Sequence, residues 1–383
     1  MRLRVLSCAL VLAALVAGCG GSTPEETETP DGALTIYSSL PLQGPGAERS
    51  RDIVDGEKLA LAASGGRIGP LTISYRSLDD AGPEGGWKPD ETVDAARAAA
   101  ADVTTIAYLG DFEAGATALS LPTTNAAGVL QVSPGTSYDG FTGGRGAGTG
   151  EPEKYEPSGA RTYARIPPPD AAQAAAMAAV LDEHGCRRAA VLTAESAFEV
   201  SLGELVADEL ARRGVRVAHT EQVRADPDPE AHADAAQAVV DAGARCVAFA
   251  GTIVDEPASL LEALRAADPA LRFVLPMGLA DAELARAIAP VAEATTIVGP
   301  PPPSTRFAER FAEEFGRQPG PWAQYGHTAM RRVLEAIEAA GESGNDRTAV
   351  TESYLALPRP AEDLALWQPG PDGLRLERRL PAA

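Results

Sequence analysis

Two short polar segments carry the residues best suited to hold a small ligand: DFEAG at 111–115 and SPGTS at 133–137. Asp111 and Glu113 supply carboxylates, while Thr136 and Ser137 supply hydroxyls. A helix that begins at residues 114–116 would add free backbone N–H groups, which favour an anion or a carboxylate. This combination of groups is suited to binding a polar solute.

The two acids, Asp111 and Glu113, have two interpretations. Acidic residues at the start of a helix commonly cap it and complement its dipole, an effect of about 0.3–1 kcal/mol. Alternatively, one of the two points at a cationic or hydroxyl-rich ligand. The sequence leaves both interpretations open.

No set of residues predicts catalysis, a metal site or a cofactor. A G-x-S-x-G motif is absent, Ser137 has no nearby histidine, and the four histidines are scattered. We expect His184 and His232 to face solvent. The glycines of 139–161 follow no strand and precede no helix, so they do not form a dinucleotide-binding loop. A hydrolase on an α/β scaffold is therefore the weakest alternative.

The elements around the two polar segments predict where they meet. Residues 104–110 form an apolar run typical of a buried strand, 114–127 a helix, and 128–133 a second strand. In a parallel α/β sheet, the carboxyl ends of the strands and the helix N-termini gather at one edge, where ligands bind. Both segments should therefore face one cleft.

The same alternation of strands and helices runs along the chain and predicts two lobes. It occurs between residues 34 and 133 and again between residues 170 and 298. The predicted fold class is α/β, with two doubly wound lobes, each built on a parallel sheet. The N-terminal lobe is expected to contain 33–158 plus 303–347, and the C-terminal lobe 161–300 plus 350–383.

Composition also predicts the connections between the lobes. The four prolines at 300–303 form a stiff, extended connector and a candidate crossing. The Gly-rich stretch 139–161 is interpreted as a mobile insertion beside a crossing, from which Tyr155 could reach the mouth of the cleft. The last residues form a hairpin around 370–373 that returns to the second lobe.

The N-terminus predicts export. A basic start and an apolar run precede the sequence Val-Ala-Gly-Cys that ends at Cys19, which is the pattern of a lipoprotein signal peptide over 1–19. Cys19 would carry the lipid and 20–32 would form a flexible tether. An ordinary secretory signal cleaved near Ala17 is the alternative. We expect the protein on the outer face of the cytoplasmic membrane.

Charge and cysteine content narrow the class of partner. The formal net charge of −21 argues against nucleic acid, which needs a basic surface. Beyond the signal segment the chain keeps Cys186 and Cys246. In an exported protein such a pair is a disulfide candidate, and two buried free thiols are the alternative.

The order of motifs resembles the type I periplasmic (solute-)binding proteins, in particular the leucine/isoleucine/valine-binding group. That group shows G-x-x-S-G-x-x-x-A-x-x-P followed by G-I-P-x-I-S-P-S-A-T. The matching residues here are Gly110, Gly115, Ala118, Pro122, Gly128, Val129, Ser133, Pro134 and Ser137. An earlier family signature matches at Pro41, Leu42, Gly44, Ala47, Gly56, Leu59 and Ala60, and a later one at Tyr325, Gly326 and His327.

The resemblance implies a ligand site shared by both lobes. The implied ligand-binding residues are Arg49, Glu113, Ala114, Gly115, Gly135, Thr136 and Ser137 in one lobe, and Phe198, Glu199, Thr252 and Gly278 in the other. Arg49 stands in place of an aromatic of the family and Glu199 in place of a glycine, and two further departures concern the ligand's charged groups. Ala114 stands where a serine holds the ligand carboxylate, and Gly278 stands where an acid pairs with the ligand ammonium, although Asp281 is close by.

The resemblance further implies a lipid-anchored substrate-binding protein of an ABC importer. It would act as a monomer, without a cofactor, binding an amino acid or a related small polar solute by hinge closure and delivering it to permease subunits. A sensor or regulatory lipoprotein with the same cleft is the alternative.

Overall fold

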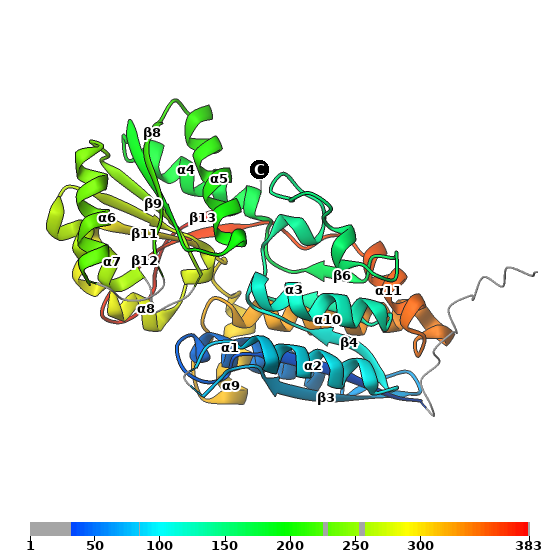
Figure 1. The fold of residues 1–383 in the computed structure, drawn as a ribbon. Coiled ribbons are helices and arrows are strands. Elements are labelled where there is room, and N and C mark those ends of the chain that lie inside the picture. The colour runs from blue at the N-terminus through cyan, green and yellow to red at the C-terminus, as the bar shows by residue number, and fades with distance from the viewer. Residues whose placement is uncertain (1–31, 84, 225–228, 253–256, 382–383) are drawn as a thin grey trace, which may run out of the picture.

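The computed structural model describes residues 32–83, 85–224, 229–252 and 257–381. The predicted signal peptide, Cys19 and nearly all of the predicted tether lie outside the described residues. Figure 1 shows two α/β lobes, with the blue and cyan segments in one and the green and yellow segments in the other. The predicted fold class is confirmed.

The first lobe is built on a six-stranded sheet in the order β2-β3-β1-β4-β5-β6. All neighbouring strands run parallel except β2 and β3. Its strands are β1 (Ala33–Leu40), β2 (Arg67–Ile68), β3 (Leu71–Asp79), β4 (Thr105–Leu109), β5 (Leu130–Ser133) and β6 (Tyr163–Arg165). Its helices are α1 (Ala47–Ala63), α2 (Pro89–Ala101), α3 (Ala114–Ala126), α9 (Thr305–Phe315), α10 (Ala323–Ala340) and α11 (Arg347–Ala356).

The second lobe is built on a seven-stranded sheet in the order β13-β12-β11-β10-β9-β7-β8. The last two strands are antiparallel and form the predicted hairpin. The strands are β7 (Arg188–Thr193), β8 (Arg216–Gln222), β9 (Cys246–Ala250), β10 (Arg272–Leu275), β11 (Thr295–Gly299), β12 (Leu364–Gln368) and β13 (Arg375–Leu380). The helices are α4 (Asp170–Glu183), α5 (Ala197–Arg212), α6 (Pro229–Asp241), α7 (Pro257–Ala267) and α8 (Ala282–Ala287).

Local sequence explains where several helices begin. Pro89 and two acidic residues occupy the first turn of α2, as the helix dipole favours. Ser196 caps α5 by accepting a hydrogen bond from the backbone N–H of Glu199. Asp281 caps α8 in the same way, and Asp346 caps α11. These side chains satisfy backbone donors that a helix start leaves without partners.

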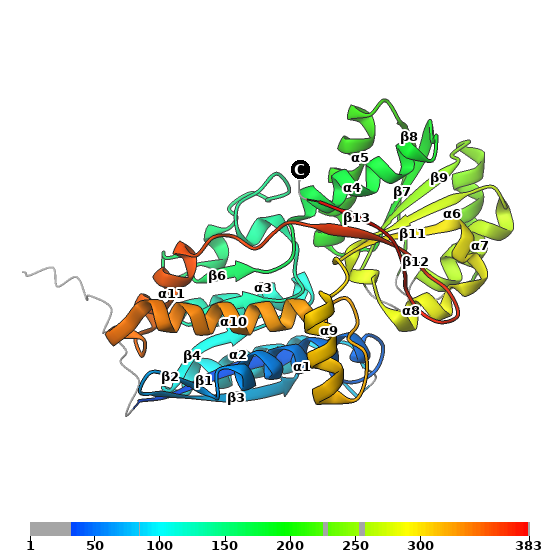
Figure 2. The ribbon, with the colours of Figure 1, turned by 180° about the vertical axis from the view of Figure 1, so that it is seen from behind.

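The chain crosses between the sheets at 166–169, 300–304 and 357–363, where strands of one sheet connect to elements of the other. Every crossing contains proline, and the predicted crossing at 300–303 is one of them. Proline fixes its own φ, so these connections have few rotatable bonds. Figure 2 shows α10 and α11 in the first lobe and the red strands of the hairpin in the second.

Two predicted boundaries between the lobes were wrong. The second lobe was expected to begin at 161, but β6 pairs with β5 and extends the first sheet. It was also expected to include 350–356, but α11 packs on β4 and β5. Arg347 anchors α11 there by donating to the carbonyls of Thr105, Ala127 and Asp102 at 2.8, 2.9 and 3.0 Å.

Two glycines let α1 and α10 pack closely. A Cβ atom on Gly56 would collide with the carbonyl oxygen of Ala323, and one on Gly326 would collide with that of Ile53. The two helices therefore approach backbone to backbone, and α1 is held where its N-terminal turn reaches the other lobe.

The Gly-rich stretch 139–161 is packed and is not the mobile insertion that its composition predicted. Phe141 lies fully buried among Tyr138, Tyr155 and Tyr163. Glu151 fixes the loop by accepting from the hydroxyls of Tyr138 and Tyr155 at 2.7 and 3.0 Å. Tyr155 is 7% exposed inside this cluster, so it does not reach the mouth of the cleft.

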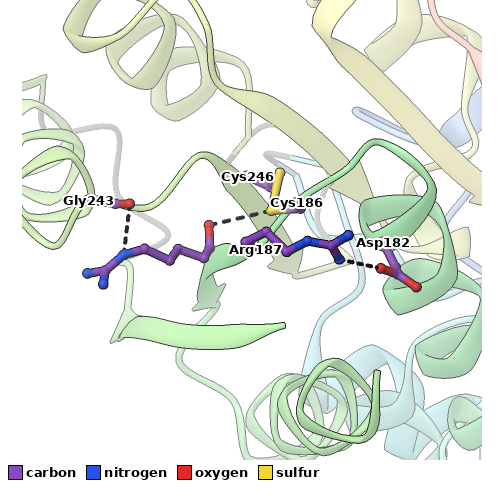
Figure 3. The surroundings of a disulfide bond; sticks show 6 residues. Asp182, Cys186, Arg187, Gly243 and Cys246 are labelled. Carbon is purple, nitrogen blue, oxygen red and sulfur yellow. Dashed lines mark hydrogen bonds and ion pairs between the residues drawn. A yellow bond between two sulfur atoms is a disulfide. The ribbon is translucent and has the colours of Figure 1, made fainter. Parts of the chain in front are cut away.

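A disulfide joins Cys186 to Cys246, whose Cα atoms are 6.2 Å apart. Figure 3 shows the bond where the segment before β7 meets the start of β9. Next to it, Arg187 pairs with Asp182 at 3.1 Å, and the side chain of Arg188 donates to the carbonyl of Gly243. The pairing predicted from the cysteine count is thus present between two neighbouring strands of the second sheet.

Within the described part of the chain, no helix combines the length and apolar character needed to span a membrane.

Candidate ligand-binding cleft

A cavity of about 350 Å³ lies between the lobes, at the carboxyl ends of strands of both sheets. Its size is within the usual range for small-molecule sites, about 300–1,000 Å³. Side chains and backbone of both lobes line it. The lining residues are Trp87, Phe112, Glu113, Ala114, Gly115, Gly135, Thr136, Ser137, Tyr138, Asp170, Gln173, Ala194, Glu195, Ser196, Phe198, Glu199, Leu202, Thr252, Pro276 and Gly278.

The structure brings nearly all of the predicted site residues to this cavity. Those that line it are Glu113, Ala114, Gly115, Gly135, Thr136, Ser137, Phe198, Glu199, Thr252 and Gly278. Arg49 does not line the cavity but lies directly behind it. That these residues bind a ligand stays a prediction.

Arg49 links the two lobes. It is 4% exposed on α1 and donates to the carbonyl oxygen of Gly278 at 2.6 Å. It also pairs with Glu113 at 3.3 Å, and its guanidinium lies 3.6 Å from the centre of the Phe112 ring. Burial lowers the pKa of Arg49, while the charge of Glu113 opposes that effect. Arg49 therefore fixes Glu113 and Phe112 in the wall of the cavity and joins the first lobe to Gly278 of the second.

Glu113 points toward Arg49 and does not cap α3. It occupies the N-cap position, but its side chain accepts no hydrogen bond from the helix start. Burial raises the pKa of Glu113, Arg49 lowers it, and the charge of Glu199 raises it. Glu199, from α5 of the other lobe, accepts from the hydroxyl of Thr252 at 2.9 Å, and burial raises its pKa also. Two carboxylates from different lobes thus face one cavity.

Aromatic rings form much of the wall. Phe112 packs edge-on against buried Trp322, with ring centres 4.8 Å apart, and Tyr138 packs on Phe198 at 4.9 Å. Trp87 lies over Gly115, where a Cβ atom would come within 2.7 Å of the indole. The absence of a side chain at Gly115, and likewise at Gly135 under Phe112, gives these rings room to reach the backbone.

Both predicted hydroxyls of the first lobe already have partners. Thr136 donates to the carbonyl of Phe112 at 3.0 Å. Ser137 accepts from the amide of Gln173 at 3.1 Å, and its hydroxyl also bonds the carboxyl of Asp170. Burial raises the pKa of Asp170 to about 6, and this hydrogen bond opposes the shift. The hydroxyls therefore order the loop that follows β5, and Ser137 links it to α4 of the second lobe.

Asp111 supports the cleft without entering it. It is fully buried and accepts from Tyr108 at 2.8 Å, from Ser120, and from Gln131 at 3.3 Å. Burial raises its pKa to about 7. Of the two acids considered in the sequence, Glu113 alone lines the cavity. Asp111 holds the turn between β4 and α3 in place.

Sequence reasoning missed several residues of the cleft, notably Trp87, Phe112, Tyr138, Asp170 and Gln173. Phe112 lies inside the DFEAG segment, and aromatics make up only 5% of the chain. Each aromatic residue next to a predicted cleft loop was therefore informative. Gln173 carried no such signal, since it lies on α4 and bridges Ser137 to the backbone N–H of Met277.

The prediction that His184 and His232 face solvent is confirmed for only one of them. His184 is exposed, as predicted. His232 is 2% exposed rather than solvent-facing, because α6 packs against α7 and Ser259 bonds its Nδ1 at 2.9 Å. No cluster of three or more His, Cys, Asp or Glu side chains suited to a metal ion occurs among the residues that the structure describes.

Comparison with known proteins agrees with this geometry. A family model described as periplasmic binding protein matches residues 35–365. The comparison with curated proteins returned no match. A leucine binding protein from Thermotoga maritima is 18% identical, with a TM-score of 0.75 over 91% of this chain and 99% of that one.

Two further solved structures are similar. A solute binding protein of an ABC transporter from R. palustris, in complex with benzoate, is 16% identical, with a TM-score of 0.74 over 92% of this chain and 98% of its own. A substrate-binding protein from Desulfitobacterium hafniense, in complex with Leu, is 16% identical, with a TM-score of 0.67 over 91% and 96%. At these identities the likeness is one of fold.

Proposed function

Because the chain belongs to the periplasmic binding protein family, a family of binding proteins and not of enzymes, we propose that it is the solute-binding component of an ABC importer. It would capture a small organic solute outside the cytoplasm and present it to permease subunits. The observation that carries this proposal is the cavity of about 350 Å³, which residues of both lobes line.

A site shared by two lobes suits capture by hinge closure, because the ligand contacts both lobes only when they are close together. The lobes contact each other around the cavity through Arg49, through Gln173 and through the edge-to-face pair of Tyr138 and Phe198. The similar structures in complex with leucine and benzoate support a small organic solute. Anchoring through a lipid on Cys19 belongs to the same proposal and rests on the sequence before residue 20.

The test is a thermal-shift screen of the signal-free protein against amino acids, amides, amines, short peptides, polyols and aromatic acids. A ligand that binds only the native state at a hundred times its Kd stabilises it by about 2.7 kcal/mol. We expect at least one class to raise the Tm. If no class does, transport loses its support and a sensor that binds a protein partner becomes the better hypothesis.

The anchor is tested separately with full-length protein in a bacterial host. We expect the protein in the membrane fraction and the C19A variant released into the extracytoplasmic fluid. Equal release of both forms would instead support the ordinary secretory signal.

A further inference from the structure

We propose that the solute is an organic cation whose charged nitrogen binds between Glu113 and Glu199 and whose apolar body packs on the aromatic wall. The inference rests on the proposed function, because it names the chemical class of solute for the same cleft. Its support comes from four features: the charge of the lining, an unpartnered carboxylate oxygen, the occupied hydroxyls, and the aromatic rings.

The lining of the cavity is acidic. Glu113, Asp170, Glu195 and Glu199 contribute carboxyl groups, and no Lys, Arg or His is among the described residues that line it. Arg49, which contacts the lining from behind, is already bonded to Gly278 and Glu113. An anionic solute would enter against a surplus of negative charge, whereas a cation would offset it.

Glu113 has a buried oxygen that lacks a partner. Its side chain is 10% exposed and its Oε1 pairs with Arg49, but its Oε2 makes no hydrogen bond to any described residue. A buried carboxylate oxygen without a donor is unfavourable. A protonated amine carries donors that could satisfy this oxygen and Glu199 together.

The groups expected to hold a ligand carboxylate are otherwise engaged. Thr136 donates to a backbone carbonyl, and Ser137 bonds Gln173 and Asp170. Ala114 lacks the hydroxyl that the resemblance leads one to expect at that position. The backbone N–H groups at the start of α3 remain, but Glu113 lies directly next to them. An amine without a carboxylate therefore fits better than a zwitterion.

The rings of Trp87, Tyr138 and Phe198 complete the fit, while that of Phe112 already carries the guanidinium of Arg49. Aromatic faces attract organic cations and exclude water from the apolar part of a ligand. The two glutamates also belong to different lobes, so a cation between them contacts both only when the cleft is closed. Such a ligand would favour closure, because it binds the closed state better than the open one.

The experiment is calorimetric titration of the signal-free protein with matched triplets. Phenethylamine, phenylalanine and 3-phenylpropionate share one body and differ in their charged groups. Tyramine with tyrosine and 3-(4-hydroxyphenyl)propionate, and isoamylamine with leucine and 4-methylpentanoate, repeat the comparison with other bodies. We expect the amine of at least one triplet to bind at least tenfold more tightly than its zwitterion, with no measurable binding of the acid.

Variants test the two glutamates. We expect E113Q and E199Q each to weaken amine binding at least tenfold while keeping the cooperative unfolding of the parent. E204Q, an exposed glutamate on the same helix as Glu199, is the control and should bind like the parent. Unchanged amine affinity in both site variants would overturn the assignment of the charged nitrogen.

The outcomes separate this inference from the proposed function. Tightest binding of a zwitterion or an acid, or binding of a neutral polyol or amide with no amine binding, overturns the cation and leaves solute capture standing. Failure of every amine, together with failure of every class in the thermal-shift screen, counts against both.

Discussion

At the scale of single residues, three buried carboxyl groups of the first lobe make stability depend on pH. Asp80, Asp111 and Glu57 are fully buried, and burial raises their pKa values to about 9, about 7 and about 8. The charge of Asp111 is the second cause of the shift at Asp80. At neutral pH the folded protein therefore holds protons on Asp80 and Glu57, and partly on Asp111, that the unfolded chain releases.

The sign of the pH dependence follows from these shifts. A carboxyl group whose folded pKa exceeds its unfolded value contributes stability that is complete below the unfolded value, near 4. That contribution disappears as the pH rises through the folded values of about 7 to 9. We expect the Tm and the urea midpoint to fall between pH 5 and pH 9.

The D80N variant isolates one of these groups. Asparagine has a similar shape and does not ionise, so the fall in stability between pH 5 and pH 9 should shrink by at least about 1.4 kcal/mol, the equivalent of one pKa unit. D94N, at an exposed position of α2, is the control and should keep the parent slope. An unchanged slope in D80N would show that Asp80 is ionised in the folded protein.

Some residues of the site can be predicted from the sequence alone. The loops that contain Glu113 to Gly115 and Gly135 to Ser137 are continuous in sequence and follow predicted strands, so a local pattern and the family resemblance identify them. Asp80, which follows the end of β3, is 0% exposed. Its burial, like the position of Gln173, depends on how separate elements pack, and a single sequence does not encode that in any local pattern.

At the scale of elements, the close contact of α1 with α10 sets the position of Arg49. We expect G56A to destabilise the protein by about 1–3 kcal/mol, because a methyl group at this position overpacks the contact with Ala323. Alanine would otherwise stabilise a helix interior by about 0.5–1 kcal/mol relative to glycine. A loss therefore identifies packing as the cause.

Urea denaturation measures this effect, and K58A on the exposed side of α1 is the matched control. It should change the free energy of unfolding by less than about 0.5 kcal/mol. If G56A were as stable as the parent, the two helices would have to separate without cost, and the close approach would have no structural role.

The order of the elements was largely predictable, because apolar segments typical of buried strands alternate with segments of helical periodicity in both lobes. The exceptions are short or peripheral. Strand β6 has three residues and follows a Gly-rich stretch, so it is too short to show the alternation of apolar and polar residues that marks a strand. Helix α11 joins the first lobe through hydrogen bonds of Arg347 to backbone carbonyls, which leave no pattern in its own sequence. Both errors displaced a lobe boundary without changing the fold class.

At the scale of the whole molecule, three proline-containing crossings connect the lobes. Closing a cleft of this kind changes backbone angles at a few hinge residues while the lobes stay rigid. Prolines in the crossings at 166–169, 300–304 and 357–363 restrict those angles. We infer that the open state is confined to few conformations, so that closure around a solute loses little entropy.

Replacing Pro301 and Pro302 together by glycine tests this link. The looser crossing should enlarge the open ensemble and weaken solute binding by up to about 1 kcal/mol per proline, while the cleft itself is unchanged. Calorimetry gives the affinity, and small-angle X-ray scattering gives the radius of gyration of the ligand-free protein, which should rise. P70G, in the β2–β3 turn away from the crossings, is the control. Equal affinity and equal radius in the hinge variant would show that the other two crossings alone define the motion.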